Sequence, residues 1–70
     1  MNQERIGKFI MEARHEVGLT QKELAEKIGV SDRTISKWEN GEGYPEVETL
    51  IEIARNLHLS IDTLMHEELS

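Results

Sequence analysis

Residues 20–40 read TQKELAEKIGVSDRTISKWEN, and this stretch predicts two short helices joined by a tight turn. Thr20 and Glu23 form a Thr-x-x-Glu capping box, which starts a helix at Gln21. Apolar residues recur at helical spacing along that helix, and they are Leu24, Ala25 and Ile28. The first of the two helices therefore spans about residues 21–28.

A second helix follows after a turn of about three residues. Gly29 supplies the left-handed backbone that ends the preceding helix. Ser31 is a favourable N-cap for a helix that begins at Asp32. Ile35 and Trp38 turn one face of this helix toward the core. Because the turn is so short, the two helices must cross steeply, which is the layout of a helix-turn-helix. In that motif the second helix enters the major groove of DNA.

A further helix is predicted before the motif, and a loop after it. Apolar side chains at i, i+3, i+4 and i+7 spacing predict a helix over about residues 2–17, ended by Gly18. These side chains are Ile6, Phe9, Ile10, Ala13 and Val17. After Trp38, residues 40–45 read NGEGYP and are dense in helix breakers, so they predict a loop.

Two more helices complete the expected fold. Pro45 and the apolar stripe that follows it predict a helix over about residues 46–57. Ser60 with Asp62 starts a fifth, short helix that carries apolar residues, namely Ile61, Leu64 and Met65. The expected fold is all-α: one compact five-helix domain over residues 1–70, with its core at about residues 6–65.

Composition excludes several classes of protein. A chain of 70 residues makes one small domain, and it contains no cysteine for a disulfide or thiolate metal site. It has no transmembrane span and no signal-peptide pattern, so a soluble, cytoplasmic protein is expected. Its histidines, His15, His58 and His66, lack metal-ligand spacing. Since no catalytic arrangement occurs either, we expect neither an enzyme nor a cofactor.

The net charge of −6 is unevenly distributed. Residues 1–41 carry seven basic and seven acidic side chains, so their net charge is zero. Residues 42–70 carry Arg55 against seven acidic side chains, which accounts for the whole −6. DNA affinity depends on the potential near phosphate rather than on total charge. DNA binding thus stays compatible with the composition, although non-specific binding should be weak and sensitive to salt.

A larger set of residues at fixed spacing adds to these periodicities. The set is Thr20-Gln21-x-Glu23-Leu24-Ala25-x-Lys27-x-Gly29-Val30-Ser31, Ile35-Ser36-x-Trp38-Glu39-Asn40-Gly41, Pro45, Leu50, Ile53-Ala54 and Leu57. It resembles the phage-repressor and Cro-like helix-turn-helix family, also called the xenobiotic-response-element family of bacterial regulators. The resemblance covers about residues 6–64. It implies a five-helix, lambda-repressor-like domain that binds double-stranded DNA by sequence, usually as a dimer on palindromic operators.

Four side chains on the outward face of the third helix are candidates for contacting bases. Arg33 can bond guanine O6 and N7 together, although a phosphate contact is nearly as well supported. Lys37 could reach a guanine or a phosphate, and Ser36 could approach either. Asp32 could accept a bond from cytosine N4, or could simply favour the positive end of the helix dipole.

Other residues are candidates for contacting the DNA backbone. Gln21 begins a helix, where free N–H groups suit a phosphate, and the resemblance implies the same role. Ser31 is first a cap and second a phosphate or base contact. Asn40 and the Gly41 backbone resemble the family's second phosphate clamp, which Glu42 should weaken because relatives often carry a basic residue there.

One pair of charged residues has a structural interpretation. Glu39 lies on the inward side of the third helix, where an unpaired carboxylate would be costly. Arg14, on the flank of the first helix, matches the family's buried arginine partner. We therefore expect a salt bridge between Arg14 and Glu39, with a contact from Arg14 to phosphate as the alternative.

Two functions remain open from sequence. The first is a transcriptional repressor whose dimer contact, by the resemblance, comes from the C-terminal helices. Candidate contacts are Leu64, Met65 and Leu69, with Tyr44 nearby, and closure of the monomer core is the alternative for Leu64. The second is a protein-interaction module, such as an antitoxin or adaptor, whose acidic fourth and fifth helices bind a basic partner.

Overall fold

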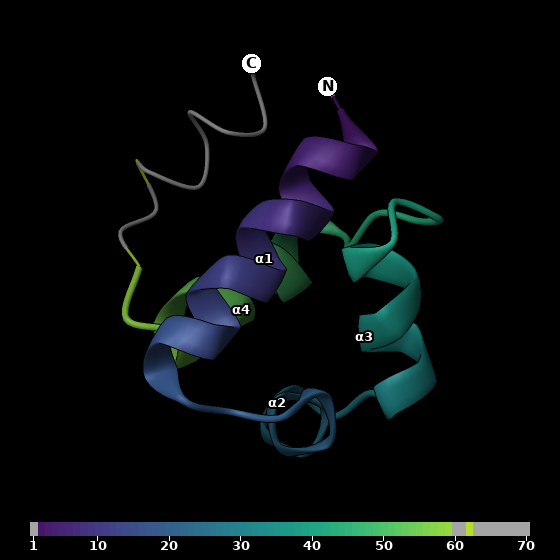
Figure 1. The fold of residues 1–70 in the computed structure, drawn as a ribbon. Helices are drawn as coiled ribbons and strands as arrows, with labels where there is room; N and C mark the ends of the chain where they lie inside the picture. The colour runs from purple at the N-terminus through teal and green to yellow at the C-terminus, as the bar shows by residue number, and fades with distance from the viewer. Residues whose placement is uncertain (1, 60–61, 63–70) are drawn as a thin grey trace.

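A computed structural model describes residues 2–59 and 62 of the chain. Over these residues it contains four helices and no strand: α1 (Gln3–Val17), α2 (Gln21–Ile28), α3 (Asp32–Glu39) and α4 (Val47–Asn56). In Figure 1, α1 runs in front of α4, α2 lies across the lower end of the bundle, and α3 stands to the right of α1. The fold is all-α, as expected.

The number of helices differs from the expected five. The structure describes four, because all residues of the fifth helix predicted from Ser60 except Asp62 fall outside the described part of the chain; Asp62 itself is helical. Three of the candidate dimer contacts, Leu64, Met65 and Leu69, also lie outside the described residues.

The predicted helix boundaries are confirmed to within a residue or two, since local capping sets them. Both bonds of the capping box are present: Thr20 Oγ1 accepts from the Glu23 N–H (3.0 Å), and Glu23 Oε1 accepts from the Thr20 N–H (2.8 Å). Gly29 ends α2 with a φ of 77°, a conformation that favours glycine. Ser31 caps α3, and its side chain accepts from the Thr34 N–H.

Apolar side chains from all four helices form a single core. The fully or almost fully buried members are Ile6, Ile10, Ala13, Leu24, Ala25, Ile35, Leu50, Ile53, Ala54 and Leu57. Helix α3 packs against α1 and α2, and α2 also packs against α4. Gly7 lets α1 approach α3 closely, because a β-carbon at this position would collide with the carbonyl oxygen of Trp38. The core therefore fixes α3 along one face, while Asp32, Arg33 and Lys37 on the other face are exposed.

None of the described helices combines the length with the apolar character that crossing a bilayer demands.

Candidate nucleic-acid interface

The orientation of α3 is set by what it buries. Ile35 is completely buried, and Glu39, one turn further on, is only 9% exposed. Trp38 is half-buried and packs against the core. Residues on the opposite face of the same helix must therefore point away from α1 and α2.

That outward face carries the four predicted base-contacting residues. Asp32, Arg33 and Lys37 are exposed, and Ser36 is half-buried. Within residues 2–59 and 62, neither Arg33 nor Lys37 forms an ion pair or a side-chain hydrogen bond. Both positive charges are thus available to an external ligand.

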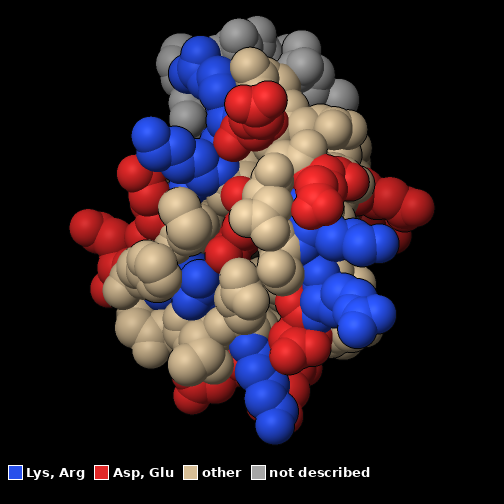
Figure 2. Space-filling model, turned by 45° about the vertical axis from the view of Figure 1, so that its right-hand side comes forward, with Lys and Arg blue, Asp and Glu red and all other residues tan. Residues whose placement is uncertain are grey.

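Basic and acidic side chains are mixed on this side of the molecule. Figure 2 turns the molecule so that the α3 side of Figure 1 comes forward, and Lys and Arg appear there as separate groups with Asp and Glu between them. There is no continuous basic surface in this view. A surface on which basic and acidic side chains alternate favours contacts at defined positions over strong non-specific attraction to phosphate.

The ion pair expected between Arg14 and Glu39 is present and buried. Arg14 Nε donates to Glu39 Oε2 (2.7 Å), and Arg14 Nη2 donates to Glu39 Oε1 (3.0 Å). The exposed fractions of the two side chains are 8% and 3%. Arg14 Nη1 also donates to the carbonyl oxygen of Leu19 (2.7 Å), so the pair ties α3 to α1 and to the joint before α2.

Gln21 contacts the same pair, which the sequence did not predict. Its Nε2 donates to Glu39 Oε1 at 2.9 Å, across 18 residues of chain. Gln21 is half-buried at the first position of α2. The structure therefore brings the start of α2 against the end of α3, which puts the candidate phosphate contact beside the candidate base-reading helix.

The backbone donors of the Asn40–Gly41 segment, which is the second predicted phosphate clamp, form hydrogen bonds within the protein. The Gly41 N–H donates to the Trp38 carbonyl (3.1 Å), and the Asn40 N–H donates to the Ser36 carbonyl (3.0 Å). Both backbone donors are therefore already used in ending α3. Gly41 also lies against Glu4 of α1, since a β-carbon built on Gly41 would be 2.9 Å from Glu4 Cγ. The Asn40 side chain donates one N–H to Ser36 Oγ at 3.5 Å, and its second N–H is the donor that this segment can offer a phosphate.

Two polar features at the start of α3 concern Ser31. Its hydroxyl accepts from the Thr34 N–H (3.2 Å) and lies 2.9 Å from Thr34 Oγ1. Sequence reasoning did not single out Thr34, although the Ser-x-x-Thr spacing after a helix-ending glycine could have indicated it. Ser31 therefore acts as the N-cap of α3, which is the first of the two roles predicted for it.

Tyr44 is the one candidate dimer contact within the described residues. It is half-buried and packs against the core from the loop between α3 and α4. The Tyr44 side chain therefore covers part of the hydrophobic core of its own chain.

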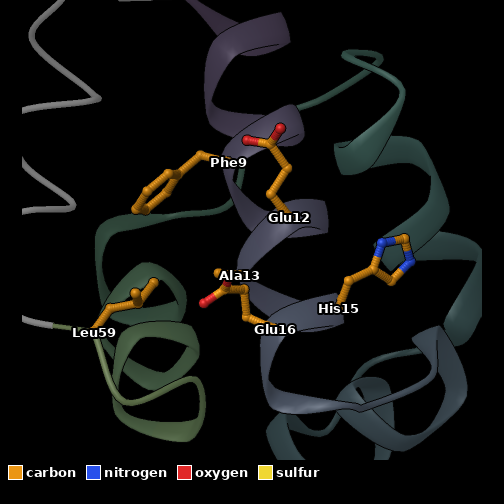
Figure 3. Close-up of a pocket in the computed structure, with 6 residues that line it drawn as sticks. All are labelled: Phe9, Glu12, Ala13, His15, Glu16 and Leu59. Atoms are coloured by element: carbon orange, nitrogen blue, oxygen red, sulfur yellow. The ribbon is translucent and has the colours of Figure 1, made fainter.

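A hollow of about 640 Å³ lies on another part of α1, away from α3. It is lined by Phe9, Glu12, Ala13, His15, Glu16 and Leu59. Figure 3 shows Phe9 and Leu59 together on one side of α1, whereas His15 points toward the opposite side. No group of three His, Cys, Asp or Glu residues within the described chain could hold a metal ion.

Comparison with known proteins identifies the family. The helix-turn-helix family model HTH_3 matches residues 10–64, which include α2, α3 and α4. The chain belongs to this helix-turn-helix family.

Curated relatives carry the names of gene regulators. The chain is 48% identical over 50 residues to the HTH-type transcriptional activator BcrR of Enterococcus faecalis, covering 71% of this chain and 24% of BcrR. It is 38% identical over 60 residues to the transcriptional repressor RstR of the cryptic phage CTXphi in Vibrio cholerae, covering 86% of this chain and 54% of RstR. This chain therefore spans between about a quarter and about half of the length of these relatives.

A solved structure agrees with the family assignment. The clp gene regulator ClgR from Corynebacterium glutamicum superimposes with a TM-score of 0.86 at 29% identity, covering 93% of this chain and 69% of that chain. This chain is thus a helix-turn-helix domain, and the relatives it resembles carry the names of transcription regulators.

Proposed function

We propose that this chain reads double-stranded DNA by sequence through α3 and represses transcription as a dimer on a palindromic operator. The observation that carries the proposal is the exposed face of α3. Arg33 and Lys37 lie there without ion-pair partners in the described chain, while Ile35 and Glu39 anchor the opposite face. An anchored helix with a polar outward face is what insertion into the major groove requires.

Base recognition would be shared among the four outward residues. Arg33 can bond guanine O6 and N7 as a pair, and Lys37, one turn further on, can reach a guanine or a phosphate. Ser36 is small enough for a base edge to approach it. Asp32 would accept from cytosine N4 and would repel sites that place a phosphate there, so its contribution is to specificity.

Backbone contacts would hold α3 in register. The side chain of Gln21, at the start of α2, and that of Asn40, directly after α3, both lie near the C-terminal end of α3, because Gln21 bonds Glu39. Ser31 contributes mainly by capping α3. Because phosphate contacts fix the position of a protein on DNA without reading sequence, losing either amide should weaken binding similarly on all duplexes.

A dimer is proposed because one domain offers few base contacts. Two copies placing their α3 helices in successive major grooves, about 34 Å apart, would read two half-sites. Leu64, Met65 and Leu69 are the proposed contacts between copies, with Tyr44 at the edge. A protein that occupies an operator represses transcription by its presence alone, so this proposal needs no catalytic step and no cofactor. Because the operator is the site of action, we propose that the protein acts in the cytoplasm.

Selection of bound duplexes from a randomised double-stranded library at low salt tests this proposal. Wild type should enrich a palindrome, and the Arg33→Ala/Lys37→Ala variant, confirmed as folded, should enrich nothing. If folded wild-type protein enriches no sequence, the proposal that this chain recognises DNA by sequence is wrong.

A second function, binding of a basic protein partner, is favoured by the acidity of α4. Glu46, Glu48 and Glu52 are exposed there, and Arg55 bonds Glu52 at 3.3 Å. Glu46→Gln/Glu48→Gln would abolish partner binding under this alternative. Arg33→Ala/Lys37→Ala would leave partner binding intact and remove only regulation through DNA.

A further inference from the structure

The carboxylate of Glu39 is shared between a buried ion pair and the candidate phosphate anchor. Its Oε2 accepts from Arg14 Nε, and its Oε1 accepts from both Arg14 Nη2 and Gln21 Nε2. The three donors come from α1 and α2, and the carboxylate comes from the last residue of α3. Three helices therefore meet at one buried acceptor.

This arrangement fixes the orientation of the Gln21 amide. A carboxylate accepts hydrogen bonds and cannot donate them, so the nitrogen rather than the oxygen of the amide must face Glu39. A bond to an ionised acceptor is stronger than one between neutral groups. Arg14 holds that acceptor in place, because it bonds both carboxylate oxygens and is itself held by the Leu19 carbonyl.

Gln21 keeps further donors beyond the one given to Glu39. As the first residue of α2, Gln21 has a backbone N–H without a carbonyl partner in its helix, and the same holds for Lys22. The amide nitrogen retains a second N–H beyond the one given to Glu39. A phosphate at the start of α2 would therefore meet donors whose positions are set in the free protein.

We propose that Glu39 is a positioning residue for the DNA-backbone contact of Gln21, with Arg14 acting through it. The inference rests on the proposed function, because it concerns how that function achieves its geometry. Since Glu39 ends α3, the same carboxylate fixes the phosphate anchor relative to the helix that reads bases. The Gln21 side chain is thus already ordered in the free protein. If it had to become ordered on binding, the affinity for DNA would be about three- to tenfold weaker.

A double-mutant cycle tests this coupling. Gln21→Ala is made in wild type and in Arg14→Met/Glu39→Met, where two apolar side chains replace the ion pair, an exchange that folded proteins often tolerate. Dissociation constants are measured with a mixed-sequence duplex at low ionic strength, and folding is checked by circular dichroism. Lys22→Ala serves as the matched control, because Lys22 neighbours Gln21 and has no bond to Glu39.

The expected result is a loss of coupling when the ion pair is removed. Gln21→Ala should weaken binding about tenfold in wild type and about threefold or less in the methionine background, whereas Lys22→Ala should have the same effect in both. Equal effects of Gln21→Ala in two folded backgrounds would overturn the positioning role. If folded wild type does not bind the duplex at all, the proposed function fails and the inference fails with it.

A measurement on wild type covers the case in which the methionine variant does not fold. The side-chain amide protons of Gln21 should exchange slowly with solvent in the free protein, and their NMR signals should shift when the duplex is added. Fast exchange in the free protein together with unshifted signals in the complex would overturn the proposal.

Discussion

Gly7 has no room for a β-carbon, because α1 and α3 pack closely at this residue. Its α-carbon lies against the Trp38 carbonyl, so α1 and α3 must separate to admit a methyl group. Gly7→Ala should lower the free energy of unfolding by about 3 kcal/mol, the upper end of what overpacking costs. Urea denaturation measures this difference.

Gly29→Ala is the matched control for that substitution. Gly29 has a φ of 77°, and a β-carbon there would have no neighbour within 4 Å. The cost should therefore be backbone strain alone, about 1–2 kcal/mol. A smaller loss for Gly7→Ala than for Gly29→Ala would contradict the close packing of α1 on α3.

Single residues also show what the sequence could and could not predict. That Glu39 needs a partner was predictable because a charged residue on an inward helix face requires one, and the family resemblance supplied Arg14 as that partner. The bond from Gln21 to Glu39 was not, since it depends on the angle at which α2 meets α3, and no periodicity encodes that angle. The backbone bonds that occupy the Asn40 and Gly41 donors were likewise invisible in a pattern of residue types.

A prediction for Arg33 separates its two possible contacts. If it reads a guanine, Arg33→Ala should weaken binding to the selected operator about ten- to a hundredfold and barely affect a mixed-sequence duplex. If it contacts a phosphate, both duplexes should lose affinity, and the slope of log affinity against log salt should fall by about one. We expect the first result, from titrations of both duplexes over a range of salt.

At the scale of elements, the N-terminus of α2 is stabilised by a charge. The bond from the Thr20 backbone N–H, followed by that with the Thr20 side chain, lowers the pKa of Glu23 from its usual 4.5. A lowered folded-state pKa means that this stabilisation is complete above the pKa of the unfolded chain. It disappears as the pH falls through the folded-state value.

Glu23→Gln tests this stabilisation. The difference in the free energy of unfolding between wild type and variant should be largest near neutral pH and should shrink as the pH falls below 4.5. Thermal unfolding over a pH series provides the measurement. A difference that stays constant from neutral to acidic pH would contradict the role given to the capping box.

Helix boundaries were the most predictable part of the fold. A cap depends on residues within three or four positions of each other, so Thr20, Gly29 and Ser31 defined the ends of α2 and the start of α3 directly. Helix α4 was predictable from Pro45 and its apolar stripe, although its first helical residue is Val47 rather than Glu46. How the four helices pack together needed the structure.

At the scale of the whole molecule, acidic charge opposes binding to DNA. Glu46, which caps α4, and Glu48 in its first turn are exposed, and the chain carries a net charge of −6. Glu46→Gln/Glu48→Gln should raise affinity for a mixed-sequence duplex several-fold at low salt. The gain should fade as the screening length drops to about 10 Å at 0.1 M salt. A gain that persists at high salt would show that these side chains act by something other than long-range repulsion.

The central claim is that α3 and the start of α2 form the DNA-binding surface. Backbone amide NMR signals of isotope-labelled protein, recorded while the selected duplex is added, test it most directly. The largest shifts should fall on residues 31–37 and on Gln21, with little change at exposed positions of α4. Shifts concentrated on α4 or around the α1 hollow, with α3 unperturbed, would contradict the claim and place recognition on another surface.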